Sequence, residues 1–345
     1  MNWISYCDRP EVVVWEMTRA CRLACTHCRA EAQPKRDPLE LDTNEARTLI
    51  DHVADIAPRF FIFSGGDPSR RPDLLELVAH AASRGLRVAL SPSATPDMLA
   101  LDFEALAEAG LACLSFSLDG ATEETHNTFR GVKRAWEWTM QGIEATRKAG
   151  IPFQINTTIT AQNYEEFDAM AALVESLKPS VWSIFMVVPT GRADVYQLPE
   201  PKQAEALLNK LCELSRRVPF AIKTTEAPQY RRIQLQQAER AGLERPHVGG
   251  TNDGRGFVFV SHRGEVCPSG FLPVSAGNVR RLPLLQIYRE SPLFRSLRNP
   301  TALKGKCGRC DYRTLCGGSR ARAFALRGDP FAEEPLCTYQ PKPQE

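Results

Sequence analysis

The sequence predicts an α/β fold: a partial (β/α)6 barrel with a small, loop-rich, cysteine-rich C-terminal extension. Three observations predict it. Between residues 12 and 223, apolar strand segments alternate with helical segments at a spacing of roughly 30 residues. Three of the helical segments end in glycine directly before an apolar strand, at Gly85, Gly110 and Gly150. After residue 223 the alternation stops and cysteines become frequent.

Strands are expected where β-branched and aromatic residues run together between turn residues. They cover residues 11–17, 60–63, 86–90, 111–118, 151–159 and 181–188. The helices between and after them cover residues 43–57, 72–84, 103–109, 135–149, 164–177 and 202–217. Asp42 or Thr43 is the expected N-cap of the first helix, because these residue types satisfy free N–H groups at helix starts.

The chain is expected to divide into three parts. Residues 1–224 form the barrel domain, residues 225–255 a polar connecting segment with a helix near 230–241, and residues 256–345 an auxiliary domain. The auxiliary domain begins with a β-hairpin, in which strands 256–260 and 264–266 flank a turn. The remainder is too short to be stable without a metal site.

Length and composition are those of a soluble globular protein. Of 345 residues, 43% are hydrophobic and 24% charged, and 43 basic against 41 acidic side chains give a net charge of +2. The clustered basic excess of a nucleic-acid-binding protein is not found, and no apolar run reaches the roughly 20 residues of a membrane-spanning helix. The first ten residues, 1–10, do not have the pattern of a secretory signal. We therefore expect a cytoplasmic protein that binds neither nucleic acid nor a membrane.

The cysteines point to metal sites. An intracellular chain does not ordinarily keep 11 cysteines as disulfides. Seven of them form two groups near opposite ends of the chain: Cys21, Cys25 and Cys28 in one, and Cys307, Cys310, Cys316 and Cys337 in the other. The other four stand alone and are expected to be free thiols: Cys7, Cys113, Cys212 and Cys267. Two such groups predict bound metal rather than disulfide bridges.

The first group has three cysteines and no fourth nearby. Its pattern is Cys21-x3-Cys25-x2-Cys28, directly after the first expected strand. A structural zinc site has four ligands, whereas a cubane iron–sulfur cluster held by three thiolates leaves one iron open for a substrate or cofactor. The spacing favours such a cluster; a partial zinc site or three unrelated thiols is the alternative.

Polar motifs stand where the expected strands end. They are Ser64-Gly-Gly-Asp67, Ser91-Pro-Ser93, Ser117-Leu-Asp-Gly120 and Pro189-Thr-Gly191. In a βα barrel the carboxyl ends of the strands carry the chemistry. Any one of these motifs alone would be a turn or a capping group, but their shared position indicates a ligand site.

With this cysteine loop and these strand ends, the sequence resembles the radical S-adenosylmethionine (SAM) superfamily. The resemblance implies that Cys21, Cys25 and Cys28 hold a [4Fe–4S] cluster whose open iron binds the amino and carboxylate groups of SAM. It also implies reductive cleavage of SAM to a 5′-deoxyadenosyl radical. An electron donor such as flavodoxin or ferredoxin would then be a partner.

The resemblance also implies which residues contact SAM. Gly65, Gly66 and Asp67 replace the family's Gly-Gly-Glu motif, whose backbone contacts the SAM amino group. Arg130 matches the arginine that pairs with the SAM carboxylate, a role suited to its forked donors. The nearby His126 is expected to cap or brace this loop. The remaining expected contacts lie at the ends of later strands: Ser93, Ser117, Asp119, Asn156, and the backbone of Met186 and Val187 towards adenine.

The second cysteine group resembles the C-terminal SPASM or twitch extension of radical SAM enzymes. Its core is Cys307-x2-Cys310-x5-Cys316, with Cys337 further along the chain. The resemblance implies one auxiliary [4Fe–4S] cluster with four protein ligands, and zinc is the alternative for the same pattern. Ser319 stands where the extension commonly has another cysteine.

Two branches with this architecture act on different substrates. One decarboxylates or trims tetrapyrrole side chains in haem biosynthesis, and the other matures ribosomal peptides. The segments 15–21, 277–279 and 316–322 resemble the haem branch, and the first strand begins too early for a preceding peptide-recognition domain. Basic residues at 230–232 and 320–322 are expected either to meet propionates or to form solvated helix faces. A non-enzymatic zinc or iron–sulfur binding protein is the remaining alternative.

Overall fold

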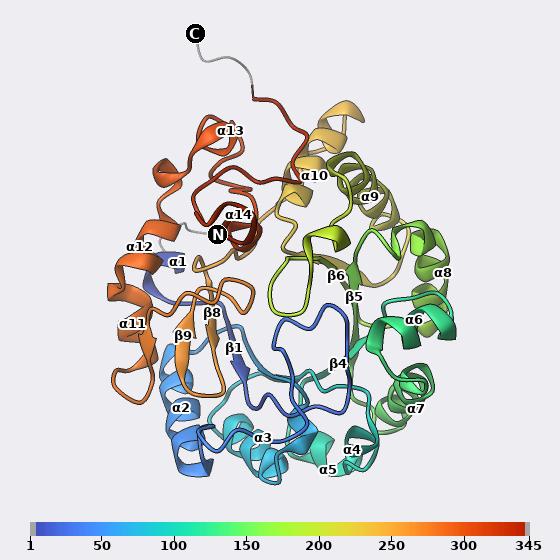
Figure 1. Cartoon of the computed structure of the whole chain (residues 1–345), viewed down its shortest axis with the longest axis vertical. Helices are drawn as coiled ribbons and strands as arrows, with labels where there is room; N and C mark the ends of the chain where they lie inside the picture. Colours follow the sequence, from blue (N-terminus) through green and yellow to red (C-terminus); the bar gives the residue numbers. More distant parts are fainter. Residues whose placement is uncertain (1–4, 342–345) are drawn as a thin grey trace.

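The computed structural model describes residues 5–341, and within them one sheet runs through the whole molecule. Its ten strands lie in the order β10-β9-β8-β1-β2-β3-β4-β5-β6-β7. Neighbours from β8 through β1 to β7 pair in parallel, and β9 pairs antiparallel with β8 and β10. Helices wrap the outer face of the curved sheet (Figure 1). Because the order is open, with β10 and β7 at its edges, the barrel is partial, as predicted.

The six predicted barrel strands are present. They are β1 (Val12–Glu16), β2 (Phe60–Ser64), β3 (Val88–Leu90), β4 (Cys113–Ser117), β5 (Phe153–Ile159) and β6 (Val181–Met186). Along β5, buried and half-buried residues alternate, because one face of the strand packs against helices and the other faces the barrel interior. Trp15 and Phe63 meet edge to face across β1 and β2, with ring centroids 5.5 Å apart.

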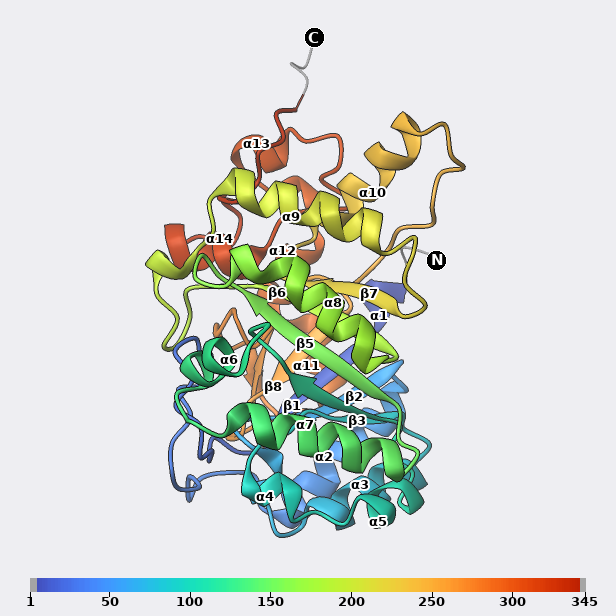
Figure 2. The same ribbon diagram turned by 90° about the vertical axis from the view of Figure 1, so that its right-hand side faces the viewer.

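The predicted helices cover the sheet. They are α2 (Thr43–Ile56), α3 (Leu74–Ser83), α5 (Phe103–Glu108), α7 (Ala135–Lys148), α8 (Phe167–Leu177) and α9 (Pro201–Leu214) (Figure 2). Asp42 is the N-cap of α2: its carboxylate accepts from the Glu45 N–H at 2.9 Å, and the Glu45 carboxylate accepts from the Asp42 N–H at 3.0 Å. Three short helices were not expected: α1 (Ser5–Asp8), α4 (Pro96–Leu99) and α6 (Glu123–Arg130).

The predicted hairpin is confirmed, and its place in the sheet was not foreseen. Strands β8 (Phe257–Val260) and β9 (Glu265–Cys267) pair antiparallel, and β8 also pairs in parallel with β1, so that Val12 lies opposite Phe257. A seventh parallel strand, β7 (Ala221–Thr225), extends the sheet beyond β6. The sheet is thus continuous through the expected boundaries at 224 and 255, and the three-part division stays a prediction.

The rest of the C-terminal part is helical and looped. It contains α10 (Gln229–Arg240), which matches the predicted helix near 230–241, then β10 (Gly277–Asn278), α11 (Leu284–Glu290), α12 (Pro292–Arg298), α13 (Gly305–Gly308) and α14 (Arg320–Arg327). In Figure 1 the residues after α10, drawn in orange and red, lie along the β1 side of the sheet and beside α10. None of the helices among residues 5–341 combines the length and the hydropathy needed to cross a membrane.

Candidate functional site

The first cysteine group lies on the long loop that follows β1, at the carboxyl end of the barrel strands. In Figure 1 this dark-blue loop lies in front of the sheet, near its centre. The loop is closed on itself, because the Cys21 N–H donates to the Gln33 carbonyl at 2.8 Å. It is also fastened to its surroundings: the Ala24 N–H donates to the Arg130 carbonyl at 3.1 Å, and the Arg192 N–H donates to the Cys28 carbonyl at 3.0 Å.

Each of the three sulfurs has a hydrogen-bond donor. The Leu23 N–H donates to Cys21 Sγ at 3.3 Å, and the Ala32 N–H donates to Cys28 Sγ at 3.4 Å. Arg130 lies 3.6 Å from Cys25 Sγ through its NH1 group. Donors to sulfur are a feature of thiolate ligands in iron–sulfur sites. Cys21 and Cys25 are buried, and burial raises the pKa of Cys21 to about 11 in the chain without metal, although a hydrogen bond with Ser93 opposes this.

Gly65 and Gly66 lie where no side chain fits. A Cβ on Gly65 would lie 2.5 Å from the Thr18 carbonyl oxygen, and one on Gly66 would lie 2.6 Å from that of Arg19. Gly65 also has a φ of 152°, which favours glycine. The Gly66 N–H donates to the Thr18 carbonyl at 2.7 Å. In the described chain these glycines therefore allow the β2 loop to approach the start of the cysteine loop.

Asp67 joins the ends of β2 and β3. Its buried carboxylate accepts from the Ser69 N–H at 3.2 Å, from the Ser93 N–H at 3.4 Å and from Thr95 Oγ1 at 2.6 Å. Ser93 Oγ in turn donates to the Gly66 carbonyl at 2.6 Å. Burial raises the pKa of Asp67, and these hydrogen bonds oppose the rise. The Asp67 side chain thus links the loop after β2 to the loop after β3 by hydrogen bonds.

Arg130, at the end of α6, contacts both Cys25 and Asp119. One NH group pairs with Asp119 Oδ2, and the other Asp119 oxygen accepts from the Thr158 N–H at 2.7 Å. Both carboxylate oxygens of Asp119 thus have partners within the chain. The Nε atom of Arg130 is buried and has no hydrogen-bond partner within residues 5–341, and the same holds for His27 Nδ1 in the cysteine loop. Unpartnered buried polar atoms beside the three sulfurs fit a site that binds a polar ligand.

His126 braces the same region, as expected. Its Nδ1 accepts from the Asp119 N–H at 3.1 Å, and its Nε2 lies 3.4 Å from Thr139 Oγ1. Burial and the charge of Arg130 lower the pKa of His126 to about 3. The imidazole is therefore neutral and holds the end of β4 against α7.

A small cavity brings several of these residues together. It has a volume of about 200 Å³ and is lined by Leu23, Ser93, Ala94, Ser117, His126, Arg130, Ala135 and Thr139. Three of the residues expected to contact SAM, Ser93, Ser117 and Arg130, are among them. Leu23, Ala94, Ala135 and Thr139 were not foreseen, because apolar and hydroxyl residues in such positions carry no distinctive signal.

The expected contacts on β5 and β6 lie away from this cavity. The Asn156 side chain accepts from Gln154 Nε2 at 2.6 Å. The carbonyl oxygens of Met186 and Val187 each accept from Arg322 at 3.2 Å. The acceptors that were expected to face adenine are thus engaged within the chain, and contact of these residues with SAM stays a prediction.

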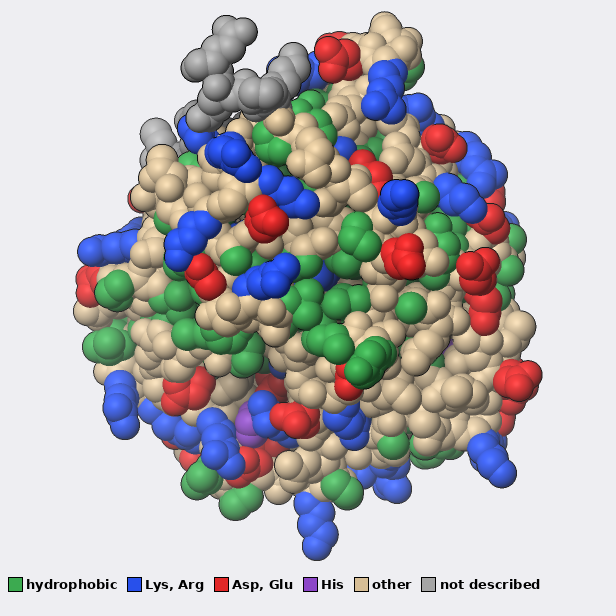
Figure 3. All heavy atoms as spheres, turned by 45° about the horizontal axis from the view of Figure 1, so that its top comes forward, with side chains coloured by type: hydrophobic (Ala, Val, Ile, Leu, Met, Phe, Trp, Pro, Cys, Tyr) green, Lys and Arg blue, Asp and Glu red, His purple; other side chains and the backbone are tan. Residues whose placement is uncertain are grey.

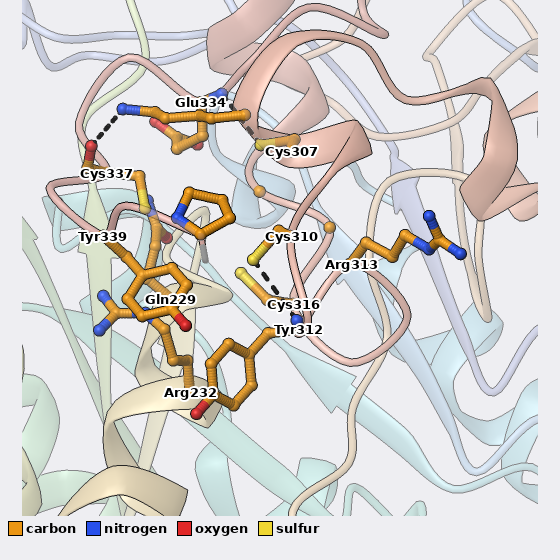
Figure 4. A pocket seen from close by; sticks show the side chains of 14 residues that line it. Gln229, Arg232, Cys307, Cys310, Tyr312, Arg313, Cys316, Glu334, Cys337 and Tyr339 are labelled. Atoms are coloured by element: carbon orange, nitrogen blue, oxygen red, sulfur yellow. Dashed lines mark hydrogen bonds between the residues drawn. The ribbon is translucent and has the colours of Figure 1, made fainter. Parts of the chain in front are cut away.

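The second cysteine group lines one pocket of about 370 Å³. Figure 4 shows the side chains of Cys307, Cys310, Cys316 and Cys337 around this space, with Tyr312 and Tyr339 at one side. The Glu334 N–H donates to Cys307 Sγ at 3.3 Å, and the Tyr312 N–H donates to Cys310 Sγ at 3.4 Å.

Basic groups surround the same thiols. Arg320 NH2 lies 3.9 Å from Cys307 Sγ, and Lys306 Nζ donates to the Cys337 carbonyl at 2.5 Å. Burial raises the pKa of Cys316 to about 12 and that of Cys337 to about 11, so a metal would be needed to deprotonate them at neutral pH. Four thiols with donors and nearby cations fit an anionic metal–thiolate group.

Neither cysteine group has the arrangement of a site for a single metal ion. In the part of the chain from residue 5 to 341, no three Cys, His, Asp or Glu side chains are grouped as ligands of a single metal ion. A [4Fe–4S] cluster spreads its thiolates over four iron atoms and therefore spaces them more widely.

The single cysteines and Ser319 lie apart from ligand positions. Ser319 is the N-cap of α14, where its Oγ accepts from the Arg322 N–H at 3.0 Å and donates to Glu226. Ser319 thus caps α14 and binds Glu226, which explains a serine at this position. Cys267 is buried in β9, where burial raises the pKa of the thiol to about 12. The other three are exposed, half-buried and buried respectively: Cys7, Cys113 and Cys212.

The basic residues at 230–232 and 320–322 follow neither of the two expectations. Their guanidinium groups have partners within the chain instead of being free for propionates, and Arg232, Arg320 and Arg322 are buried rather than on solvated helix faces. Arg231 donates to the carbonyls of Thr251 and Leu315, and Arg232 pairs with Glu205 at 2.6 Å. Arg320 donates to the carbonyls of Gly318, Pro330 and Ala332, and Arg322 forms a fully buried ion pair with Glu334 at 2.9 Å. These guanidinium groups hold loops of the C-terminal part together, a role that sequence position does not reveal.

The chain matches known proteins over nearly its full length. The family model described as "Radical SAM superfamily" matches residues 15–174. The chain is 42% identical to the AdoMet-dependent heme synthase of Methanosarcina barkeri, covering 98% of this chain and 99% of that protein. It is 43% identical to the AdoMet-dependent heme synthase of Oleidesulfovibrio alaskensis, covering 96% and 88%.

A solved structure shares the fold. Streptococcus suis SuiB, in its crystal structure bound to the precursor peptide SuiA, aligns with a TM-score of 0.74 at 16% identity. The alignment covers 96% of this chain and 76% of SuiB.

Proposed function

Because this chain belongs to the radical SAM superfamily, it is an enzyme that uses a [4Fe–4S] cluster and SAM, and we propose that it modifies a carboxylate side chain of a tetrapyrrole. The observation that carries the proposal is the 42% identity to a haem synthase over 98% of this chain and 99% of that protein. A match of this extent includes the barrel, the cysteine loop and the C-terminal part together.

We assign the catalytic cluster to Cys21, Cys25 and Cys28. The donors at each sulfur and the closed loop support this assignment. When bound, the cluster would supply one electron for cleavage of SAM to methionine and a 5′-deoxyadenosyl radical. That radical would take a hydrogen atom from a propionate side chain, and loss of carbon dioxide would then leave a vinyl group and one electron, which an auxiliary cluster at the second cysteine group could accept.

The chain's own residues position these groups. Asp119 orients Arg130 so that its free Nε is available for the SAM carboxylate, and Gly65 and Gly66 let the β2 loop lie close to the cysteine loop. The cavity lined by Leu23, Ser93 and Arg130, among others, lies beside the cysteine loop and gives a ligand room next to Arg130.

We assign a second, auxiliary [4Fe–4S] cluster to Cys307, Cys310, Cys316 and Cys337. With all four positions filled by protein, such a cluster suits electron transfer or structural support rather than substrate binding. A flavodoxin or a ferredoxin is the proposed electron donor, because SAM cleavage consumes one electron at low potential.

The direct test is an anaerobic assay of the reconstituted, brown enzyme with SAM, a reductant and candidate tetrapyrroles. We expect Fe-coproporphyrin III or a sirohaem-derived carboxylate to change the Soret band, to yield 5′-deoxyadenosine and to lose mass as carbon dioxide or a two-carbon fragment. A Cys21→Ala, Cys25→Ala, Cys28→Ala variant should form no 5′-deoxyadenosine. If no tetrapyrrole binds, the substrate assignment is wrong.

A peptide substrate is the second candidate, because the chain is also 29% identical to the PqqA peptide cyclase of Rhizobium meliloti, over 96% of this chain and 88% of that protein. The candidates separate in one experiment: a peptide encoded beside the gene would gain a new crosslink or lose mass in the same anaerobic assay, while tetrapyrroles would remain unchanged.

A further inference from the structure

A charged cluster of Glu16, Arg19, Arg29 and His262 lies at the carboxyl end of β1. Glu16 is fully buried, and its carboxylate accepts from Arg29 NH1 at 2.9 Å and from Arg19 Nε at 3.2 Å, and lies 2.9 Å from His262 Nδ1. Burial alone would raise its pKa, but the charges of Arg29 and Arg19 and the contact with His262 lower the pKa of Glu16 to about 2. Glu16 is therefore an ionised anchor.

The two arginines have more donors than their partner can use. Each uses one nitrogen on Glu16, and neither makes another side-chain hydrogen bond within residues 5–341. Their side chains are 36% (Arg19) and 17% (Arg29) exposed. The carboxylate of Asp37 is not a second partner for the two arginines. It lies 3.2 Å from the other ring nitrogen of His262 and forms an ion pair with Arg263. Two guanidiniums thus share one buried carboxylate, with positive charge and N–H groups left to face a ligand.

The charged cluster lies next to the first cysteine group. Arg29 follows Cys28 directly, and its guanidinium lies 4.6 Å from the centre of the Phe259 ring on β8. Gly270 lets the chain pass close to it, since a Cβ there would lie 3.0 Å from the Arg29 Cδ and Nε atoms. The cluster therefore lies between the cysteine loop and the C-terminal part.

A pair of aromatic side chains begins one residue after Gly270, the glycine that lies close to Arg29. Phe271, next to Gly270, packs against Phe185 of β6 with ring centroids 6.4 Å apart, and both side chains are half-buried. Thr190 Oγ1 donates to the Phe271 carbonyl at 3.2 Å, which ties this loop to the end of β6. Figure 3 shows one face of the molecule, on which hydrophobic side chains are mixed with basic and acidic ones. Aromatic rings beside a guanidinium suit a flat apolar molecule with carboxylates at its edge.

We infer that Arg19 and Arg29, anchored by Glu16, bind a side-chain carboxylate of the substrate while Phe185 and Phe271 contact its apolar ring. The inference rests on the proposed function, and it identifies where the substrate is recognised. Arg19 and Arg29 are thus proposed for the role that the sequence suggested for the arginines at 230–232 and 320–322, whose donors are engaged within the chain. The inference also places the substrate between the cysteine loop and the segment around Phe259 and Gly270.

The test measures anaerobic binding of two probes by Soret titration: Fe-coproporphyrin III, which has free carboxylates, and its tetramethyl ester. Wild-type enzyme is compared with Arg29→Gln, Arg29→Lys and Arg19→Gln. Arg47→Gln is the matched control, because Arg47 pairs with Glu76 on the exposed outer face of α2. The affinity for SAM is measured in parallel for every variant.

We expect wild type to bind the acid more tightly than the ester. Arg29→Gln should bind the acid at least about tenfold more weakly, since a hydrogen bond to a charged group is lost, and should bind the ester as wild type does. Unchanged ester binding shows that the variant is folded. The affinity of Arg29→Lys for the acid should lie between those of wild type and Arg29→Gln. Arg47→Gln should bind the acid as tightly as wild type does.

Two results would overturn the inference while the proposed function stands. One is wild-type affinity for the acid in both Arg29→Gln and Arg19→Gln, and the other is a loss of SAM affinity with porphyrin affinity unchanged. The second would assign the arginines to the SAM carboxylate. If wild-type enzyme binds neither probe, the proposed function fails and the inference fails with it.

Discussion

One guanidinium, that of Arg130, lies between a carboxylate and a sulfur at the centre of the candidate site. Its contacts with Asp119 and Cys25 use its terminal nitrogens and leave Nε buried without a partner among residues 5–341. A buried donor without a partner costs free energy. A ligand carboxylate would satisfy that donor and be held beside the three cysteines.

Replacing Arg130 should therefore weaken SAM binding. We expect Arg130→Gln to lose about 1.5–3 kcal/mol of binding free energy, because a charge-assisted hydrogen bond is removed. Equilibrium dialysis of SAM against the anaerobic, reconstituted enzyme measures the SAM dissociation constant. Arg134→Gln is the control, since Arg134 is 62% exposed and pairs with Glu137 on the surface. An unchanged SAM dissociation constant for Arg130→Gln would exclude the role.

His126 makes stability depend on pH. Burial and Arg130 lower its pKa to about 3 in the folded protein, against 6.5 for an ordinary histidine. As pH falls below about 6.5, the unfolded chain takes up a proton that the folded protein refuses, so stability is lost from that pH down towards pH 3. Between about pH 7.5 and 5.5, we expect wild type to lose about 1 kcal/mol more than His126→Asn, measured by anaerobic urea unfolding. Equal losses in the two proteins would show that His126 titrates normally when folded.

At the scale of elements, the buried side chain of Arg322 links α14 to the barrel. Arg322 pairs with Glu334 and donates to carbonyls at the end of β6 and to that of Glu226. Both members of the ion pair have fully buried side chains. The auxiliary cysteine region and the barrel are therefore packed as one unit around this pair.

Breaking the pair should cost more than removing it. We expect Arg322→Met to lower the free energy of unfolding by about 3–5 kcal/mol, because Glu334 is left as a buried, unpaired charge. The double variant Arg322→Met, Glu334→Leu should recover part of this loss. Urea unfolding of the three proteins gives the comparison, and a double variant no more stable than Arg322→Met would contradict the ion-pair account.

Local pattern predicted some elements and missed others for identifiable reasons. Strands β1 to β6 were predicted because each is apolar and bounded by turn residues. Strand β7 was missed because its residues are exposed or half-buried, so its Lys-Thr-Thr sequence has no apolar signal. Helix α6 was missed because His126 and Phe129 are its only buried residues within the described chain.

The candidate site was predictable to the extent that its signals are local. The cysteine spacings predicted both groups, the strand-end positions predicted Ser93 and Ser117, and the resemblance to the radical SAM superfamily predicted Arg130. Contacts between distant segments gave no signal: Arg322 reaches the Met186 carbonyl across 136 positions of the chain. The arginines at 320 and 322 were misread for the same reason, since burial by distant loops decides their role.

At the scale of the whole molecule, two cysteine groups from opposite ends of the chain belong to one packed structure. The second group should hold iron independently of the first. We expect a Cys316→Ser, Cys337→Ser variant to lose about four iron atoms per chain and to keep the rest. Elemental analysis of anaerobically reconstituted protein measures both iron and zinc. Cys7→Ser, at an exposed thiol, is the control. Loss of zinc with iron unchanged would identify the second site as a zinc site.

The parallel pairing of β8 with β1 determines when the barrel can be completed during synthesis. Val12 lies opposite Phe257, so the first strand lacks one neighbour until residues 257–260 of the 345 have been made. At about 5–20 residues per second, that wait is on the order of 10–50 s. Over this interval one edge of β1 exposes unpaired backbone groups, which attract other strands. A ribosome-bound chain of this protein therefore has an aggregation-prone edge directly before its cysteine loop, and chaperone binding during translation should concentrate there.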